Sequence, residues 1–105
     1  MKKQDFLIAD KLKKELSSNI NLLDLRVFGS RAIETNDEYS DMDVYIQVET
    51  VTKEIKEKIS DIAWKIGYDN NIVISTLIYT REEVVNSPIR SSPIIKNIYQ
   101  YGIVI

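Results

Sequence analysis

The apolar residues of this chain recur with a helical period in two long segments. Ile8, Leu12 and Leu16 are spaced four residues apart, which predicts a helix over residues 5–18. The clearest pattern covers residues 52–66, where Lys and Glu separate the apolar positions Ile55, Ile59, Ile62, Ala63 and Ile66. We expect both helices to turn these apolar stripes toward a common core.

The second helix carries signals at both ends and one aromatic residue outside its apolar stripe. Thr52 is a favourable N-cap, and Gly67 is expected to end the helix. Trp64 lies off the stripe. If Trp64 is exposed, it is a candidate contact for a partner protein; if another element packs on it, it belongs to the core.

Three further segments predict strands. Residues 22–28 are rich in Leu, Val and Phe and end at Gly29, and residues 72–79 are rich in β-branched side chains. Residues 43–49 alternate, with Val44, Ile46 and Val48 on one face and Asp43, Tyr45 and Gln47 on the other. This alternation predicts a half-buried strand with a polar face, and Asp41 precedes it in the same phase.

The C-terminal segment predicts two short helices. Thr80 followed by Glu83 fits a capping box for a helix over residues 81–85. A Ser-Pro pair at residues 92–93 starts another helix, whose inward positions would be Ile94, Ile95, Ile98 and Tyr101.

Gly102 would end that helix, and residues 103–105 would add an edge strand. The order of helices and strands predicts the α+β class, with a small mixed β-sheet flanked by helices. The length of 105 residues fits a single domain that spans residues 1–105.

The amino-acid composition says little about the fold, but it excludes several kinds of functional site. The net charge is −2, from 14 basic and 16 acidic residues, so direct binding to nucleic acid is not expected. The chain has no cysteine and no histidine, which excludes disulfides, thiolate or imidazole metal sites, and Ser-His or Cys-His nucleophiles. Any metal would be held by oxygen. No membrane span or signal peptide is evident, so we expect a soluble cytoplasmic protein.

One spaced motif carries the candidate chemistry: Gly29-Ser30, ten further residues, and then an Asp-Met-Asp sequence. Gly29 allows a tight turn, and Ser30 would cap a short helix starting near Arg31. Such a helix start is an anion site, to which Arg31 adds positive charge. Asp41 and Asp43 leave their strand on one face, where they can share a magnesium or manganese ion with substrate phosphates.

Each half of this motif also has a plain structural explanation. A Gly-Ser pair commonly ends a strand and caps a helix. The acidic residues could simply form a solvated loop: Asp37, Glu38, Asp41 and Asp43. Their combination on a strand–turn–helix–loop–strand frame favours a nucleotide and metal site over two unrelated structural features.

Residues 27–32 (Val-Phe-Gly-Ser-Arg-Ala) and 40–44 (Ser-Asp-Met-Asp-Val) resemble the minimal nucleotidyltransferase (MNT) domains of the polymerase-β superfamily. The signature of that family is Gly-Ser, a ten-residue spacer and Asp-x-Asp. The resemblance implies that the Gly-Ser pair holds the triphosphate of ATP. It also implies that both aspartates are catalytic and bind Mg²⁺ or Mn²⁺.

The resemblance further implies a partner. Many MNT proteins are encoded beside a helical toxin of the HEPN type and act as its antitoxin, and some add AMP to a tyrosine of the toxin. The chain would then transfer AMP from Mg-ATP to a hydroxyl group, with pyrophosphate leaving. Because 105 residues leave little room for a substrate domain, the acceptor site would come from a partner or a second subunit.

The sequence departs from the wider superfamily at one position. Active members usually carry a third carboxylate on a neighbouring strand, where it holds metal and takes the proton of the acceptor. The corresponding segment here, residues 72–77, has no acid, and Ser75 or Thr76 occupies the expected position. A second hypothesis is therefore a catalytically impaired module that binds nucleotide and neutralises its partner by forming a complex.

Overall fold

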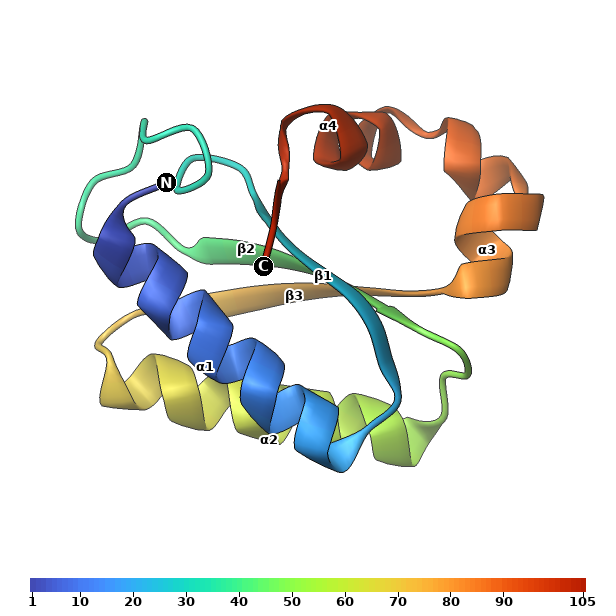
Figure 1. Ribbon diagram of the computed structural model, residues 1–105, viewed down its shortest axis with the longest axis horizontal. Coiled ribbons are helices and arrows are strands. Elements are labelled where there is room, and N and C mark those ends of the chain that lie inside the picture. The colour runs from blue at the N-terminus through green and yellow to red at the C-terminus, as the bar shows by residue number, and fades with distance from the viewer.

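A four-stranded mixed sheet forms the centre of the computed structural model, which describes all 105 residues (Figure 1). The elements are α1 Lys3–Asn19, β1 Leu22–Phe28, β2 Met42–Val48, α2 Lys53–Asp69, β3 Ile74–Thr80, α3 Arg81–Asn86, the 3₁₀ helix η1 Pro88–Ser91, α4 Pro93–Tyr101 and β4 Ile103–Val104. The strand order is β3-β2-β1-β4. β2 and β3 are parallel because α2 carries the chain back, and the other pairs are antiparallel. The predicted α+β class with a mixed sheet is therefore confirmed.

Helices α1 and α2 lie side by side across one face of the sheet and enclose the larger core (Figure 1). The predicted stripe of α1 is confirmed, since Ile8, Leu12 and Leu16 are all buried. In α2, Ile55 and Ile62 lie at the margin of the core, and the fully enclosed positions are Ile59, Ala63 and Ile66. The two strands in the middle of the sheet contribute Leu25, Val27, Met42, Val44, Ile46 and Val48.

The two ends of α2 differ in how well the sequence predicts them. The hydroxyl of Thr52 accepts a hydrogen bond from the backbone N–H of Ile55 (3.1 Å), so the predicted N-cap is confirmed. Gly67 does not end the helix, which continues to Asp69. A Cβ atom at Gly67 would lie 2.6 Å from the carbonyl oxygen of Ile72, so this glycine is required by the close approach of the chain that returns to β3.

A second layer, formed by α3, η1 and α4, covers part of the opposite face of the sheet (Figure 1). Tyr45 is completely buried there together with Ile95 and Ile98. The expectation that this face of β2 stays polar is therefore wrong at Tyr45, because α4 packs on it. Two positions expected to point inward from α4, Ile94 and Tyr101, are exposed.

The short C-terminal elements follow their sequence signals. Thr80 and Glu83 form the predicted capping box of α3, and the hydroxyl of Ser92 accepts a hydrogen bond from the backbone of Ile95 in α4. Helix α4 ends before Gly102, and β4 pairs with β1 at the edge of the sheet, as expected. The 3₁₀ helix η1 is not predicted by the pattern. None of the helices is long and apolar enough to cross a membrane.

Candidate functional site

Gly29 follows β1 and lies directly against the carboxylate of Asp43 on β2. Its φ of +73° is in the left-handed region that favours glycine. A Cβ atom at Gly29 would lie 2.5 Å from Oδ2 of Asp43, closer than any side chain can come. Phe28 and Asp43 are paired in the antiparallel β1–β2 register, so the sheet itself brings the turn to the carboxylate. The two halves of the sequence motif are therefore adjacent in space.

The segment after Ser30 is a turn and not the predicted short helix. The N–H of Ala32 donates to the carbonyl oxygen of Gly29 (3.1 Å), and Glu34, with a φ of +59°, ends the turn before a helix can form. An anion site built on a helix N-terminus is therefore absent. The backbone N–H groups of Ser30 and Arg31 donate no hydrogen bond within the protein. Unpaired N–H groups of a turn are donors of the kind that bind phosphate oxygens.

Asp41 and Asp43 form the acidic half of the site. Asp41 directly precedes β2 and Asp43 is its second residue, and the two carboxylates are close enough to repel each other. Two effects raise the pKa of the Asp43 carboxyl above the ordinary value of 3.8: the larger is its partial burial, and the smaller is repulsion from Asp41. These two groups fit a hard divalent cation such as Mg²⁺ or Mn²⁺, because such cations prefer carboxylate oxygens and a positive charge relieves the repulsion.

Strand β3 brings no third carboxylate to this pair. Its parallel register with β2 sets Ser75 beside Asp43, and Thr76 beside Val44 on the face that the helices cover. Of the two residues considered from the sequence, Ser75 is the one on the face of the carboxylates. No group of three or more carboxylate side chains is placed to hold a metal ion. A bound cation would rely on Asp41, Asp43, water and substrate phosphates.

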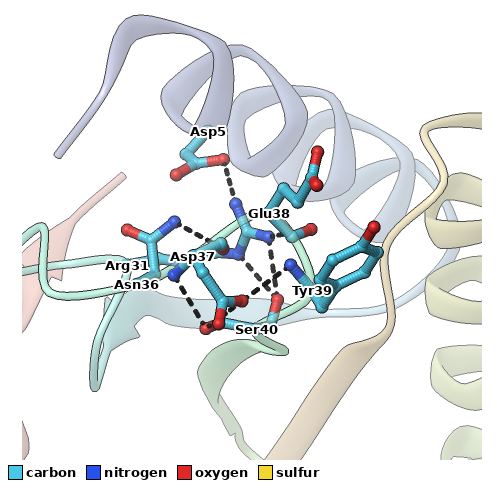
Figure 2. A network of polar contacts seen from close by, with 7 residues as sticks. All are labelled: Asp5, Arg31, Asn36, Asp37, Glu38, Tyr39 and Ser40. Carbon is cyan, nitrogen blue, oxygen red and sulfur yellow. Dashed lines mark hydrogen bonds and ion pairs between the residues drawn. The ribbon is translucent and has the colours of Figure 1, made fainter.

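Arg31 is turned into the protein, toward α1 (Figure 2). Its Nη1 donates to Oδ1 of Asp5 at 2.8 Å, and the two residues are only 5% and 4% exposed. Its Nε and Nη2 both donate to the carbonyl oxygen of Ser40, at 3.0 and 2.8 Å. The guanidinium is thus engaged inside the protein, which favours a structural role over the phosphate contact expected from the sequence.

The loop between the turn and β2 is also held by its own side chains. Oδ1 of Asp37 accepts hydrogen bonds from the backbone N–H of Tyr39 (2.8 Å) and from the hydroxyl of Ser40 (3.3 Å) (Figure 2). This arrangement is an Asx-type turn, in which a carboxylate replaces a backbone acceptor. Asp37 is therefore explained by the shape of the loop, and the plain structural explanation holds for it.

Asp5 is the residue of this region that the sequence analysis did not identify. It lies three residues before Ile8 and four before Ala9, which places it on the buried stripe of α1. A carboxylate on an apolar stripe needs a partner. The signal was therefore present in the pattern, but the partner, Arg31, is 26 positions away and could be assigned only from the fold.

Tyr45 lies two residues beyond Asp43 on the same face of β2, but it is not a proton acceptor for the site. Burial, and then the 2.8 Å hydrogen bond with Tyr99, raise the pKa of its phenol far above the ordinary value of 10.0. The guanidinium of Arg26 lies 4.2 Å from the centre of the Tyr99 ring and closes this cluster. These side chains support the sheet below the site by packing.

The sequence model of the nucleotidyltransferase domain family matches residues 9–105. The chain belongs to this family. The match includes the turn at Gly29 and both aspartates. No curated protein matches the chain significantly in sequence.

Solved structures of low sequence identity share the nucleotidyltransferase fold. A toxin–antitoxin complex with AMP-PNP superposes with a TM-score of 0.63 at 19% identity, over 91% of this chain and 70% of that chain. A proposed nucleotidyltransferase from Sulfolobus solfataricus gives 0.58 at 14% identity, over 96% of this chain and 78% of that one. The complex of the tri-AMPylated Shewanella oneidensis HEPN toxin with MNT antitoxin gives 0.54 at 17% identity, over 95% and 70%.

Proposed function

We propose that this nucleotidyltransferase domain is the antitoxin of a toxin–antitoxin pair and transfers AMP from Mg-ATP to a hydroxyl group of a helical, HEPN-type toxin. The observation that carries the proposal is the contact between the turn at Gly29 and the carboxylate of Asp43. Two of the structural relatives are toxin–antitoxin complexes, one with an ATP analogue and one with an AMPylated toxin. They support the choice of nucleotide and partner.

The geometry supports a division of roles within the site. The free N–H groups of Ser30 and Arg31 would hold phosphate oxygens of the nucleotide. Asp41 and Asp43 would hold Mg²⁺, which neutralises the charge of the triphosphate. The oxygen of the acceptor would form a bond to the α-phosphorus, while the bond to the leaving pyrophosphate breaks and the proton of the hydroxyl passes to water.

An exposed aromatic pair on α2 supports the need for a protein partner. Trp64 is 70% and Tyr68 71% exposed, and their rings stack at 5.3 Å between centres. Of the two alternatives left open by the sequence, exposure favours a partner contact for Trp64 over a place in the core. Large aromatic side chains exposed together are typical of protein interfaces.

The test is transfer of labelled nucleotide to the product of the neighbouring gene, which the proposal requires to be a HEPN-type protein. With ATP labelled at the α-phosphate and Mg²⁺ present, the wild-type chain is expected to label that protein. Asp43→Ala is expected to abolish labelling, because it removes half of the carboxylate pair. Glu49→Gln, an exposed acid just beyond β2, is the control and is expected to label at the wild-type rate.

The alternative function, neutralisation by complex formation alone, is favoured by one observation, the position of Ser75 beside Asp43. Without a carboxylate there, the acceptor lacks an obvious group to take its proton. Under this alternative, neither the wild type nor Asp43→Ala labels the toxin, and both inhibit it fully. Labelling that requires Asp43 excludes the alternative.

A further inference from the structure

We infer that Asp5 and Arg31 are positioning residues, which hold Asp41 in place to share a cation with Asp43. The inference rests on the proposed metal and nucleotide site. Arg31 lies at the start of the loop that leads to β2, and Asp5 lies on α1. Their ion pair does not touch the carboxylate of Asp41 or of Asp43, and the inference gives it a role.

The backbone is anchored on both sides of Asp41. On one side, the carbonyl oxygen of Ser40 accepts two hydrogen bonds from Arg31, at 3.0 and 2.8 Å (Figure 2). On the other side, the N–H of Met42 donates to the carbonyl oxygen of Val73 at 2.9 Å, which begins the pairing of β2 with β3. Asp41 itself is exposed. The point from which its side chain leaves the backbone is therefore set by the two neighbouring peptide groups.

Only an arginine can make this set of contacts. The planar guanidinium directs Nη1 toward Asp5 while Nε and Nη2 face the single carbonyl of Ser40. A lysine at position 31 would keep the charge but would present a single nitrogen, which cannot bridge the carboxylate and the carbonyl in this geometry. The branched guanidinium thus ties the end of the loop at Ser40 to Asp5 on α1.

Stability alone does not account for this ion pair. Both residues are almost fully buried, and Oδ2 of Asp5 has no hydrogen-bond partner. Desolvation of two charges offsets most of their attraction, so a buried pair with an unsatisfied oxygen contributes little to folding. A role in fixing one geometry of the loop is consistent with its retention, as buried polar groups can specify a single arrangement.

Arg31 could affect cation binding through its charge or through the position it gives Asp41, and the two effects change the affinity in opposite directions. A positive charge near two carboxylates repels a cation, so loss of Arg31 through charge alone would strengthen cation binding. Loss of positioning would weaken it, because the carboxylate of Asp41 would no longer be held beside Asp43. Substituting Asp5 and Arg31 together leaves the net charge unchanged, which removes the charge effect.

The experiment measures binding of Mn²⁺ by the electron paramagnetic resonance signal of the free ion, without nucleotide. The double variant Asp5→Asn/Arg31→Met is expected to bind Mn²⁺ about tenfold more weakly than the wild type, which is the lower end of the loss caused by removing groups that orient a metal ligand. The control is Asp10→Asn/Lys14→Met, which removes a 2.9 Å ion pair of α1 outside the site and should leave the affinity unchanged.

Two further variants make each result decisive. Arg31→Lys keeps the charge and is expected to fold, as checked by circular dichroism, yet to bind Mn²⁺ several-fold more weakly. Wild-type affinity in Arg31→Lys or in the folded Asp5/Arg31 double variant overturns the inference. Asp43→Ala should abolish Mn²⁺ binding; a wild type whose binding does not depend on Asp43 overturns the proposed metal site itself, together with the inference.

Discussion

At the scale of single residues, Asp43 bears a stability penalty that its function explains. Burial and the repulsion from Asp41 raise its pKa, so the folded protein binds this proton more tightly than the unfolded chain does. Above the raised pKa, the ionised carboxylate therefore destabilises the fold. Asp43→Asn removes that charge and is expected to raise the melting temperature at pH 7 by about 2 °C, a value discounted for the partial exposure of the side chain.

The difference in stability between the wild type and Asp43→Asn should depend on pH. As the pH falls through the raised pKa toward 3.8, the wild-type carboxyl takes up its proton and the advantage of Asp43→Asn should disappear. Melting curves of both proteins between pH 3.5 and 7.5, in a chelator, measure this difference (the range brackets the ordinary carboxyl pKa). A difference that grows toward low pH, or an Asp43→Asn protein less stable than the wild type at pH 7, contradicts it.

At the residue scale, the sequence predicted contacts within one motif better than contacts across the fold. The spacing from Gly29-Ser30 to Asp41 and Asp43 predicted a turn near carboxylates, and the fold sets Gly29 against the carboxylate of Asp43. It could not predict the direction of Arg31, because the buried partner comes from α1. Chemistry that lies within one continuous motif can be read from the sequence, whereas a side chain that pairs across the fold cannot.

At the scale of secondary structure, helix propensity and tertiary packing favour different residues at position 67. Within α2, alanine has a higher helix propensity than glycine by about 1 kcal/mol. A Cβ at this position would nevertheless lie 2.6 Å from the carbonyl oxygen of Ile72, a backbone atom that cannot move without displacing the start of β3. Gly67→Ala is therefore expected to lower the free energy of unfolding by about 1–3 kcal/mol.

Urea denaturation followed by circular dichroism measures this change. Ser60→Ala, at an exposed position of the same helix, is the control and should leave the stability unchanged or raise it slightly. An increase in stability for Gly67→Ala would mean that local propensity dominates and that the close approach to Ile72 relaxes easily.

The bounds of the helices and strands were mostly predictable, because local signals define them. The N-cap at Thr52 and the capping box at Thr80 and Glu83 act within one turn of chain, and both form as expected. Gly67 failed as a stop signal because its constraint comes from a segment that follows the helix. The helix predicted after Ser30 failed because Glu34 adopts a left-handed conformation, which no periodic pattern indicates.

At the scale of the whole molecule, the hydrophobic periodicity does not decide whether Tyr45 and Trp64 are buried or exposed. The alternation of β2 placed Tyr45 on a polar face, yet α4 buries it completely. Trp64 lies off the stripe of α2, and no other element covers it. Which surface receives the C-terminal layer depends on how distant segments pack, so neither outcome follows from the sequence near these residues.

The energetic consequence of this packing is testable with two substitutions. Tyr45→Ala removes a fully buried ring and should lower the free energy of unfolding by about 3–5 kcal/mol, or prevent folding. Trp64→Ala removes a larger ring, but the loss should not exceed about 1 kcal/mol, because it forfeits little more than the stacking with Tyr68. Urea denaturation of both variants measures the contrast. A large loss for Trp64→Ala would place Trp64 in the core of the isolated chain and remove its exposure as support for a partner contact, whereas a small loss leaves its exposed ring free for an interface.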